Sequence, residues 1–156
     1  MSIFLTTQKI IKDWTDYNGH LNVAYYVLVF DSFGAEILNE KFKIGEHSAK
    51  TIKKSTMAVE SHITYNQEVK ENDKVDINLT YCAYDKKRLL YKLEMIHKEK
   101  KYLAATMETL VLYVDLDKRK VIEFEDDKVE IMQQFIKENK NNFNSENLKF
   151  LEKLKK

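Results

Sequence analysis

The middle of the chain alternates between apolar and polar side chains with a period of two. In the segment 56–69, Met57, Val59, Ile63 and Tyr65 share one parity and polar side chains occupy the other, which is typical of a half-buried strand. Four segments therefore read as strands: 56–69, 75–84, 88–97 and 102–114. Short polar turns separate them, so we expect antiparallel neighbours joined as a meander.

A helical period replaces this alternation near the N-terminus. After a first expected strand over 3–11, apolar positions recur from residue 23 with the spacing of one helix face. The expected buried positions are Val23, Tyr26, Val27, Phe30, Phe33, Gly34, Ile37 and Leu38. Asn22 is a suitable N-cap, and the helix should continue to about Lys41, which makes it roughly 30 Å long.

One long apolar helix among antiparallel strands needs cover on most sides, and a sheet can provide it by curling around the helix. This order predicts an α+β protein of the hotdog fold, with residues 1–125 as its domain. Residues 126–156 are expected to add helices over 128–140 and 145–156, as a C-terminal extension of the same domain.

Composition narrows the class of protein. With 156 residues and a formal net charge of +1, the chain lacks the basic excess usual in nucleic-acid binders. Its N-terminal apolar runs are too short for a membrane span or a secretory leader, and its single cysteine, Cys82, suits a reducing compartment. We therefore expect a cytoplasmic protein without nucleic-acid or membrane partners, and the spacing of its residues suggests no metal site.

The candidate chemistry lies just before the long helix, in Asp16-Tyr17-Asn18-Gly19-His20-Leu21-Asn22. The first helical turn leaves the amides of Val23, Ala24 and Tyr25 available to a developing oxyanion. Gly19 allows a tight loop, and that loop can fold the carboxylate of Asp16 back over the helix end. Asp16 could then attack an acyl carbonyl or deprotonate a water molecule that does so. Caps and turns also favour these residue types, and a lone histidine such as His20 is commonly a loop residue.

The same stretch resembles a known family. Trp14-Thr15-Asp16-Tyr17-Asn18-Gly19-His20 is similar to the motif of hotdog acyl-CoA thioesterases of the 4-hydroxybenzoyl-CoA thioesterase type, and most similar to the betainyl-CoA thioesterases of carnitine catabolism. The resemblance spans about residues 5–125 and continues in three further segments: 59–63, 87–89 and 112–115. Many relatives carry a second asparagine where this chain has Val23.

The resemblance implies an enzyme that hydrolyses the thioester of a small acyl-CoA, with coenzyme A as part of the substrate and no other cofactor. It implies that Asp16 is the catalytic carboxylate, that the amide of Val23 polarises the carbonyl and that Asn22 supports this helix end. Asn18, Gly19 and His20 would lie around the substrate. A homodimer or homotetramer is expected, because a sheet with free edges commonly pairs with a second copy.

A betainyl group would add a trimethylammonium cation, which aromatic faces and a carboxylate can bind. The candidates for that role are Trp14, Tyr17, Tyr25, Tyr26 and Glu60. Two other functions stay open on this fold: a non-catalytic acyl-CoA binding module, and a hydratase in which His20 is the base.

Overall fold

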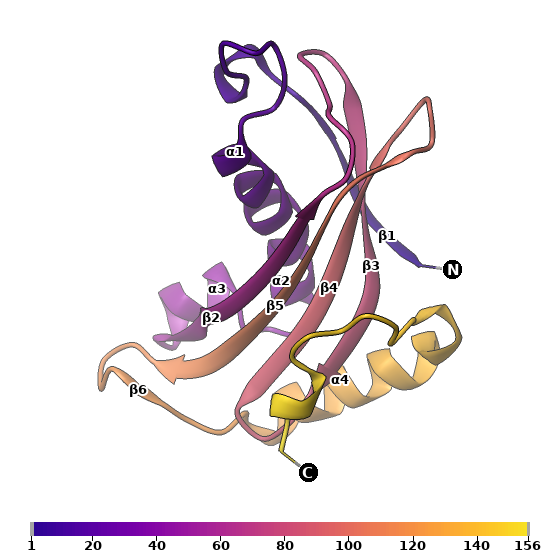
Figure 1. Ribbon diagram of the computed structural model, residues 1–156. Coiled ribbons are helices and arrows are strands. Elements are labelled where there is room, and N and C mark those ends of the chain that lie inside the picture. The colour runs from indigo at the N-terminus through magenta and orange to yellow at the C-terminus, as the bar shows by residue number, and fades with distance from the viewer. Residues whose placement is uncertain (1, 156) are drawn as a thin grey trace.

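An antiparallel sheet curls around a long helical run in the computed structural model, which describes residues 2–155 (Figure 1). The strand order is β1-β3-β4-β5-β2, and β6 adds to one end of β5. The strands are β1 Ile3–Lys9, β2 Lys54–Tyr65, β3 Lys74–Tyr84, β4 Arg88–His97, β5 Leu103–Asp115 and β6 Lys120–Val121. The α+β hotdog arrangement expected from the sequence is the one observed.

The predicted long helix is present, but its middle is wound more loosely than expected. It consists of α1 Val23–Leu28, a π-helix over Val29–Ala35 and α2 Glu36–Lys41. A π turn holds an extra residue, so the buried face rotates part-way along the helix. Val23, Val27 and Ile37, which we expected on the buried face, are exposed, so this part of the prediction is wrong.

Close packing fixes this helical run against the concave face of the sheet. A Cβ atom added at Gly34 would lie 2.8 Å from Cγ2 of Ile77 on β3, so only a glycine allows this approach. Phe30 and Leu38 from the helix and Leu79 and Leu93 from the sheet belong to the same buried cluster. The helix therefore has a fixed depth and direction in the sheet.

A β-bulge in β2 changes which side chains face the core. The pairing of β2 with β5 shifts between Ala58 and Glu60, so that Val59 is the extra residue. Ile63 packs against the core as expected, whereas Met57 and Val59 are exposed. The prediction that all these positions share one buried face is wrong, because one inserted residue reverses the alternation.

Helices α3 Glu46–Thr51 and α4 Asp126–Asn139 complete the regular structure. The sequence predicted α4 but not α3, which is only six residues long. Phe135 of α4 packs edge-to-face on Phe42, with ring centroids 5.3 Å apart. Among the described residues, no helix is both long and apolar enough to cross a membrane.

The last segment crosses the convex face of the sheet instead of forming the second predicted helix. Residues 143–155, here called the strap, contain only a single 3₁₀ turn at Leu151–Lys153. The amides of Lys149 and Phe150 donate to the two carboxylate oxygens of Glu108, at 2.6 and 2.8 Å. Because a partner on β5 binds these amides, they cannot form intrahelical bonds, and the helix predicted at 145–156 is wrong.

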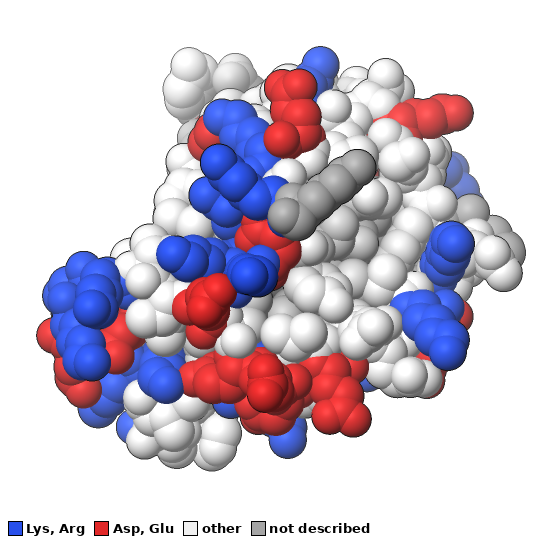
Figure 2. All heavy atoms as spheres, turned by 90° about the horizontal axis from the view of Figure 1, so that it is seen from below, with Lys and Arg blue, Asp and Glu red and all other residues white. Residues whose placement is uncertain are grey.

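Figure 2 shows the surface from below the view of Figure 1. Among the described residues, basic and acidic side chains lie next to each other over much of this face and do not form one large patch of a single sign. This face therefore lacks the continuous basic surface typical of nucleic-acid binding.

We predict that Glu108→Gln loosens the strap. Glu108 is fully buried, and a glutamine would turn an NH2 group toward one of the two amides. The free energy of unfolding should fall by about 1.5–3 kcal/mol, the range for hydrogen bonds to a charged group. Denaturant unfolding measures this change, and Glu99→Gln in an exposed turn is the matched control. Equal stability of the two variants would contradict the role assigned to Glu108.

Candidate active site

The segment between β1 and α1 folds as a tight loop closed on itself. The amide of Gly19 donates to the carbonyl of Asp16 (3.0 Å), and the amide of Asp16 donates to the carbonyl of His20 (3.1 Å). Gly19 has a φ of +82°, the left-handed region that side chains other than glycine and asparagine rarely adopt. The loop therefore turns back at Gly19, and its two arms run antiparallel, with Thr15 paired with Leu21 just before the helix cap Asn22.

One oxygen of the Asp16 carboxylate is bound within the loop. Its Oδ1 accepts a hydrogen bond from the amide of Asn18 at 2.8 Å, while Oδ2 has no hydrogen-bond partner among the described residues. The side chain is only partly buried. Asp16 is therefore oriented by its own loop and retains an oxygen that can act on a substrate or a water molecule.

The hydrogen bonds accepted by Asn22 determine which backbone amides of the first helical turn remain free to bind a ligand. Its side chain accepts from the amide of Ala24 at 3.0 Å, which confirms the predicted N-cap, and its carbonyl accepts from Tyr25 at 2.9 Å. The amide of Val23 donates to none of the described residues. Of the three candidate oxyanion donors, the structure leaves Val23 free.

A hollow of about 200 Å³ adjoins this helix end, lined by His20, Leu21, Val23, Tyr26 and residues 65–68. The rings of Tyr26 and Tyr65 meet edge-to-face with centroids 5.1 Å apart. Burial raises the pKa of the Tyr26 hydroxyl, so it stays protonated at neutral pH. Residues 65–68 could not be predicted as part of this hollow from the sequence, because only the folded sheet brings the end of β2 to the helix.

His20 is held at the rim of this hollow. Its Nδ1 lies 3.3 Å from the carbonyl oxygen of Leu21, and its Nε2 lies 3.9 Å from the carboxylate of Glu68. Its main chain pairs with Lys70. These contacts fit a loop residue that lines the site and gives the loop its shape.

The structure does not gather all of the residues predicted to bind a cationic acyl group. Trp14 is 9% exposed and stacks on Tyr25, with centroids 6.5 Å apart, whereas Tyr17 is 97% exposed. Glu60 pairs in register with Leu110 and forms an ion pair with Lys153 of the strap, so it lies on the convex face of the sheet. Glu60 therefore lies on the face of the sheet opposite to the helical run.

Two other chemistries find no support in the described part of the chain. Cys82 is buried, and its burial raises the pKa of the thiol, so it is unsuited to act as a nucleophile. No group of three or more His, Cys, Asp or Glu side chains in residues 2–155 is placed to hold a metal ion.

The described residues form a hotdog fold, and comparisons with known proteins identify the family to which the chain belongs. Residues 11–139 match the model of the thioesterase-like superfamily. A betainyl-CoA thioesterase from Pseudomonas aeruginosa is 31% identical over 127 residues, which cover 80% of this chain and 79% of that protein. The chain belongs to the thioesterase-like superfamily.

One further sequence relative and two solved structures are also similar to this chain. A fused L-carnitine dehydrogenase/betainyl-CoA thioesterase from Agrobacterium fabrum is 31% identical over 107 residues, but these cover 65% of this chain and only 20% of that enzyme. A Staphylococcus aureus protein solved in complex with CoA has a TM-score of 0.81 at 21% identity, covering 96% of this chain and 91% of that one. A DHNA-CoA thioesterase from the same organism has a TM-score of 0.77 at 19% identity, covering 90% and 93%. These structures share the fold.

We predict that the loop depends on the backbone conformation of Gly19. No atom lies within 4 Å of a Cβ added there, so the strain of a positive φ is the whole penalty. Gly19→Ala should lower the free energy of unfolding by about 1–2 kcal/mol. Gly19→Asn should be milder, because asparagine tolerates this region. Denaturant unfolding compares them, and an alanine variant as stable as the asparagine variant would contradict the prediction.

Proposed function

We propose that the chain hydrolyses the thioester of a small acyl-CoA, with Asp16 as the catalytic carboxylate and the amide of Val23 as the oxyanion donor. The observation that carries this proposal is the free Val23 amide at the start of a helical run that continues to Lys41. The helix dipole adds partial positive charge at this end, where the thioester oxygen would become negative.

Asp16 can act in two ways in this arrangement. As a nucleophile, its oxygen bonds to the acyl carbon while the carbon–sulfur bond breaks, and water then hydrolyses the mixed anhydride. As a general base, it takes a proton from water, the resulting hydroxide attacks the acyl carbon, and the thiolate leaves and is protonated. Neither route needs a resident cofactor, and coenzyme A is released as a product.

Betainyl-CoA is our candidate substrate, and it would place the enzyme in carnitine metabolism. Support comes from the two relatives named for this activity, which are each 31% identical to this chain over the aligned residues. With Glu60 on the other face of the sheet, the aromatic residues that line the hollow beside Val23 are Tyr26 and Tyr65. Such faces attract a quaternary ammonium group. The single buried Cys82 fits a cytoplasmic location.

We predict that Asp16→Asn abolishes most of the turnover without unfolding the protein. The amide keeps the shape of the side chain but neither attacks a carbonyl nor accepts a proton, so kcat should fall by roughly 10²–10⁴-fold. Release of free thiol from a panel of acyl-CoAs, from betainyl through short aliphatic to aromatic groups, measures this loss. Asp13→Asn, three residues earlier and exposed, is the control. Turnover that is unaffected by Asp16→Asn would exclude the mechanism, and binding without turnover in the wild type would favour a binding module.

We also propose that two copies pair through β2. This strand has β5 as its single partner among the described residues, so its other edge is open over its length. Exposed apolar side chains continue from this strand to the nearby helix: Met57, Val59, Tyr65, Val23 and Val27. An open edge of this kind is a template for pairing with another strand. Tyr65 also lines the hollow, so a second copy would lie beside the site.

We predict that Val59→Lys converts the assembly to monomers. A lysine at an open edge opposes pairing, because a charged, hydrated side chain would have to enter the contact between the two strands. Sedimentation equilibrium should give twice the chain mass for the wild type and one chain mass for the variant. Val121→Lys makes the same change on β6, away from the β2 edge, and should remain dimeric. A monomeric wild type, or a dimeric Val59→Lys variant, would refute pairing through β2.

A further inference from the structure

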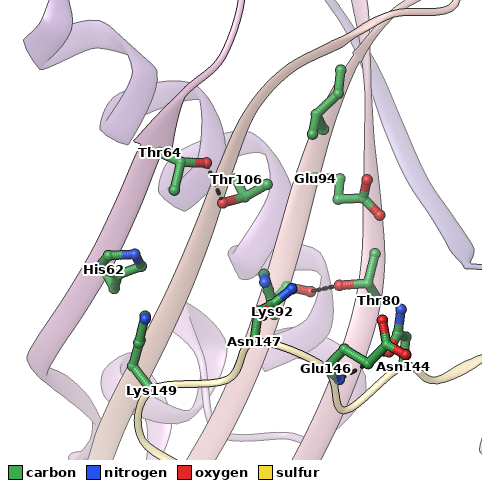
Figure 3. Close-up of a pocket in the computed structure, with 11 residues that line it drawn as sticks. His62, Thr64, Thr80, Lys92, Glu94, Thr106, Asn144, Glu146, Asn147 and Lys149 are labelled. Carbon is green, nitrogen blue, oxygen red and sulfur yellow. Dashed lines mark hydrogen bonds between the residues drawn. The ribbon is translucent and has the colours of Figure 1, made fainter.

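The convex face of the sheet carries a polar pocket that the thioesterase site does not use. It has a volume of about 440 Å³, with a floor on β2, β3, β4 and β5 and a roof formed by the strap (Figure 3). His62, Lys92, Glu94 and Thr106 belong to the floor, and Glu146 and Lys149 to the roof. Side chains from five separate segments of the chain therefore converge on one space.

This pocket and the catalytic loop lie on opposite faces of the sheet. His62 and Lys92 are both register partners of Glu108, the residue that binds the strap on the convex side. The helical run that carries Val23 packs against the concave side. A ligand in the pocket would therefore not compete directly with a thioester at Asp16.

The charged side chains of the pocket are not paired with one another. Within residues 2–155, no ion pair or side-chain hydrogen bond involves the charged groups of Lys92, Glu94, Glu146 or Lys149. Elsewhere on the same face charges do pair, as in the Glu60–Lys153 ion pair. Lys92 and Glu94 are half-buried, and a partly desolvated charge gains from a partner that the chain itself does not provide.

The two signs of charge are separated across the pocket. In Figure 3, His62 and Lys149 lie toward β2, Lys92 lies near the middle, and Glu94 and Glu146 lie toward β3. Lys92 and Glu94 are two residues apart on β4, so their backbones are about 7 Å apart. That spacing suits a small molecule that carries an anionic group and a cationic group a few bonds apart.

The uncharged lining narrows the class of ligand further. Hydroxyl and amide groups predominate, with the Thr64 and Thr106 hydroxyls hydrogen-bonded at 2.6 Å, and Leu103 is the one large apolar residue among those that line the pocket. Aromatic residues are absent from this lining, so the pocket lacks the ring faces that bind a quaternary ammonium group. The ligand should instead donate hydrogen bonds through a primary ammonium.

We propose that this pocket binds a small zwitterion of the amino-acid type, with its carboxylate toward Lys92 and Lys149 and its ammonium toward Glu94 and Glu146. Such a ligand would satisfy charges of the sheet and of the strap at once. Because Lys149 also donates its amide to Glu108, binding would hold the strap more firmly on the sheet.

The test is binding to the intact chain in the absence of any acyl-CoA. Isothermal titration calorimetry would compare glycine and 4-aminobutyrate with propionate and propylamine, which each carry a single charge. NMR would follow the imidazole resonances of His62, which lines the pocket. We expect at least one zwitterion to bind and to shift the His62 signals, and the singly charged compounds to bind at least tenfold more weakly.

Substitutions of the charged residues in the pocket test whether the zwitterion binds there. Lys92→Met and Glu94→Gln keep the size of each side chain and should each weaken the zwitterion at least tenfold, with thermal unfolding as the check on folding. Lys74→Met and Glu71→Gln make the same changes at exposed positions outside the pocket and should bind as the wild type does. Thioester turnover should be unchanged in all four.

Several results would overturn the proposal. The pocket would not be a zwitterion site if neither amino acid bound at millimolar concentration, or if propionate bound equally well. If the affinity for the zwitterion were unchanged in Lys92→Met and Glu94→Gln, the ligand would bind outside this pocket. Each of these results leaves the proposed thioesterase activity standing, because that activity is measured separately through Asp16.

Discussion

The site depends on how the hydrogen bonds of one helical turn are distributed. Asn22 accepts from Ala24 through its side chain and from Tyr25 through its carbonyl, and this leaves the amide of Val23 as the free donor. An uncapped start would leave several donors competing for water, whereas this cap leaves a single one with a fixed direction. The close approach of Gly34 to Ile77 holds the rest of the helix, so that donor has a fixed place relative to the sheet.

Much of this arrangement could be predicted from local sequence. Alternating apolar positions identified the four long strands, and the helical spacing after Asn22 identified the central helix. The cap at Asn22 and the turn at Gly19 follow from side-chain chemistry that acts within a few residues. The candidate catalytic loop was found for this reason: its geometry is set mostly by its own hydrogen bonds.

Apart from the short helix α3, the features that sequence did not predict involve residues distant along the chain. The bulge at Val59 is defined by the pairing of β2 with β5, and the π-helical stretch contains Gly34, which packs closely on Ile77 of β3. Leu148, Leu151 and Leu154 give the strap a helical period, yet Glu108 binds its amides from about forty residues away. Tertiary hydrogen bonds outweighed local propensity in that segment.

Strands β4 and β5 carry apolar side chains on the concave face of the sheet and charged side chains on the convex face. Leu93 and Met107 point into the core that supports the helix, while Lys92 and Glu108 point to the strap. A period-two alternation lets a single strand do both, because neighbouring residues face opposite sides. Side chains on the convex face can therefore be substituted without disturbing the buried contacts that position Val23. Charged residues without partners can accumulate there only if they remain hydrated or gain a ligand, since any burial of an unpaired charge lowers the stability of the whole domain.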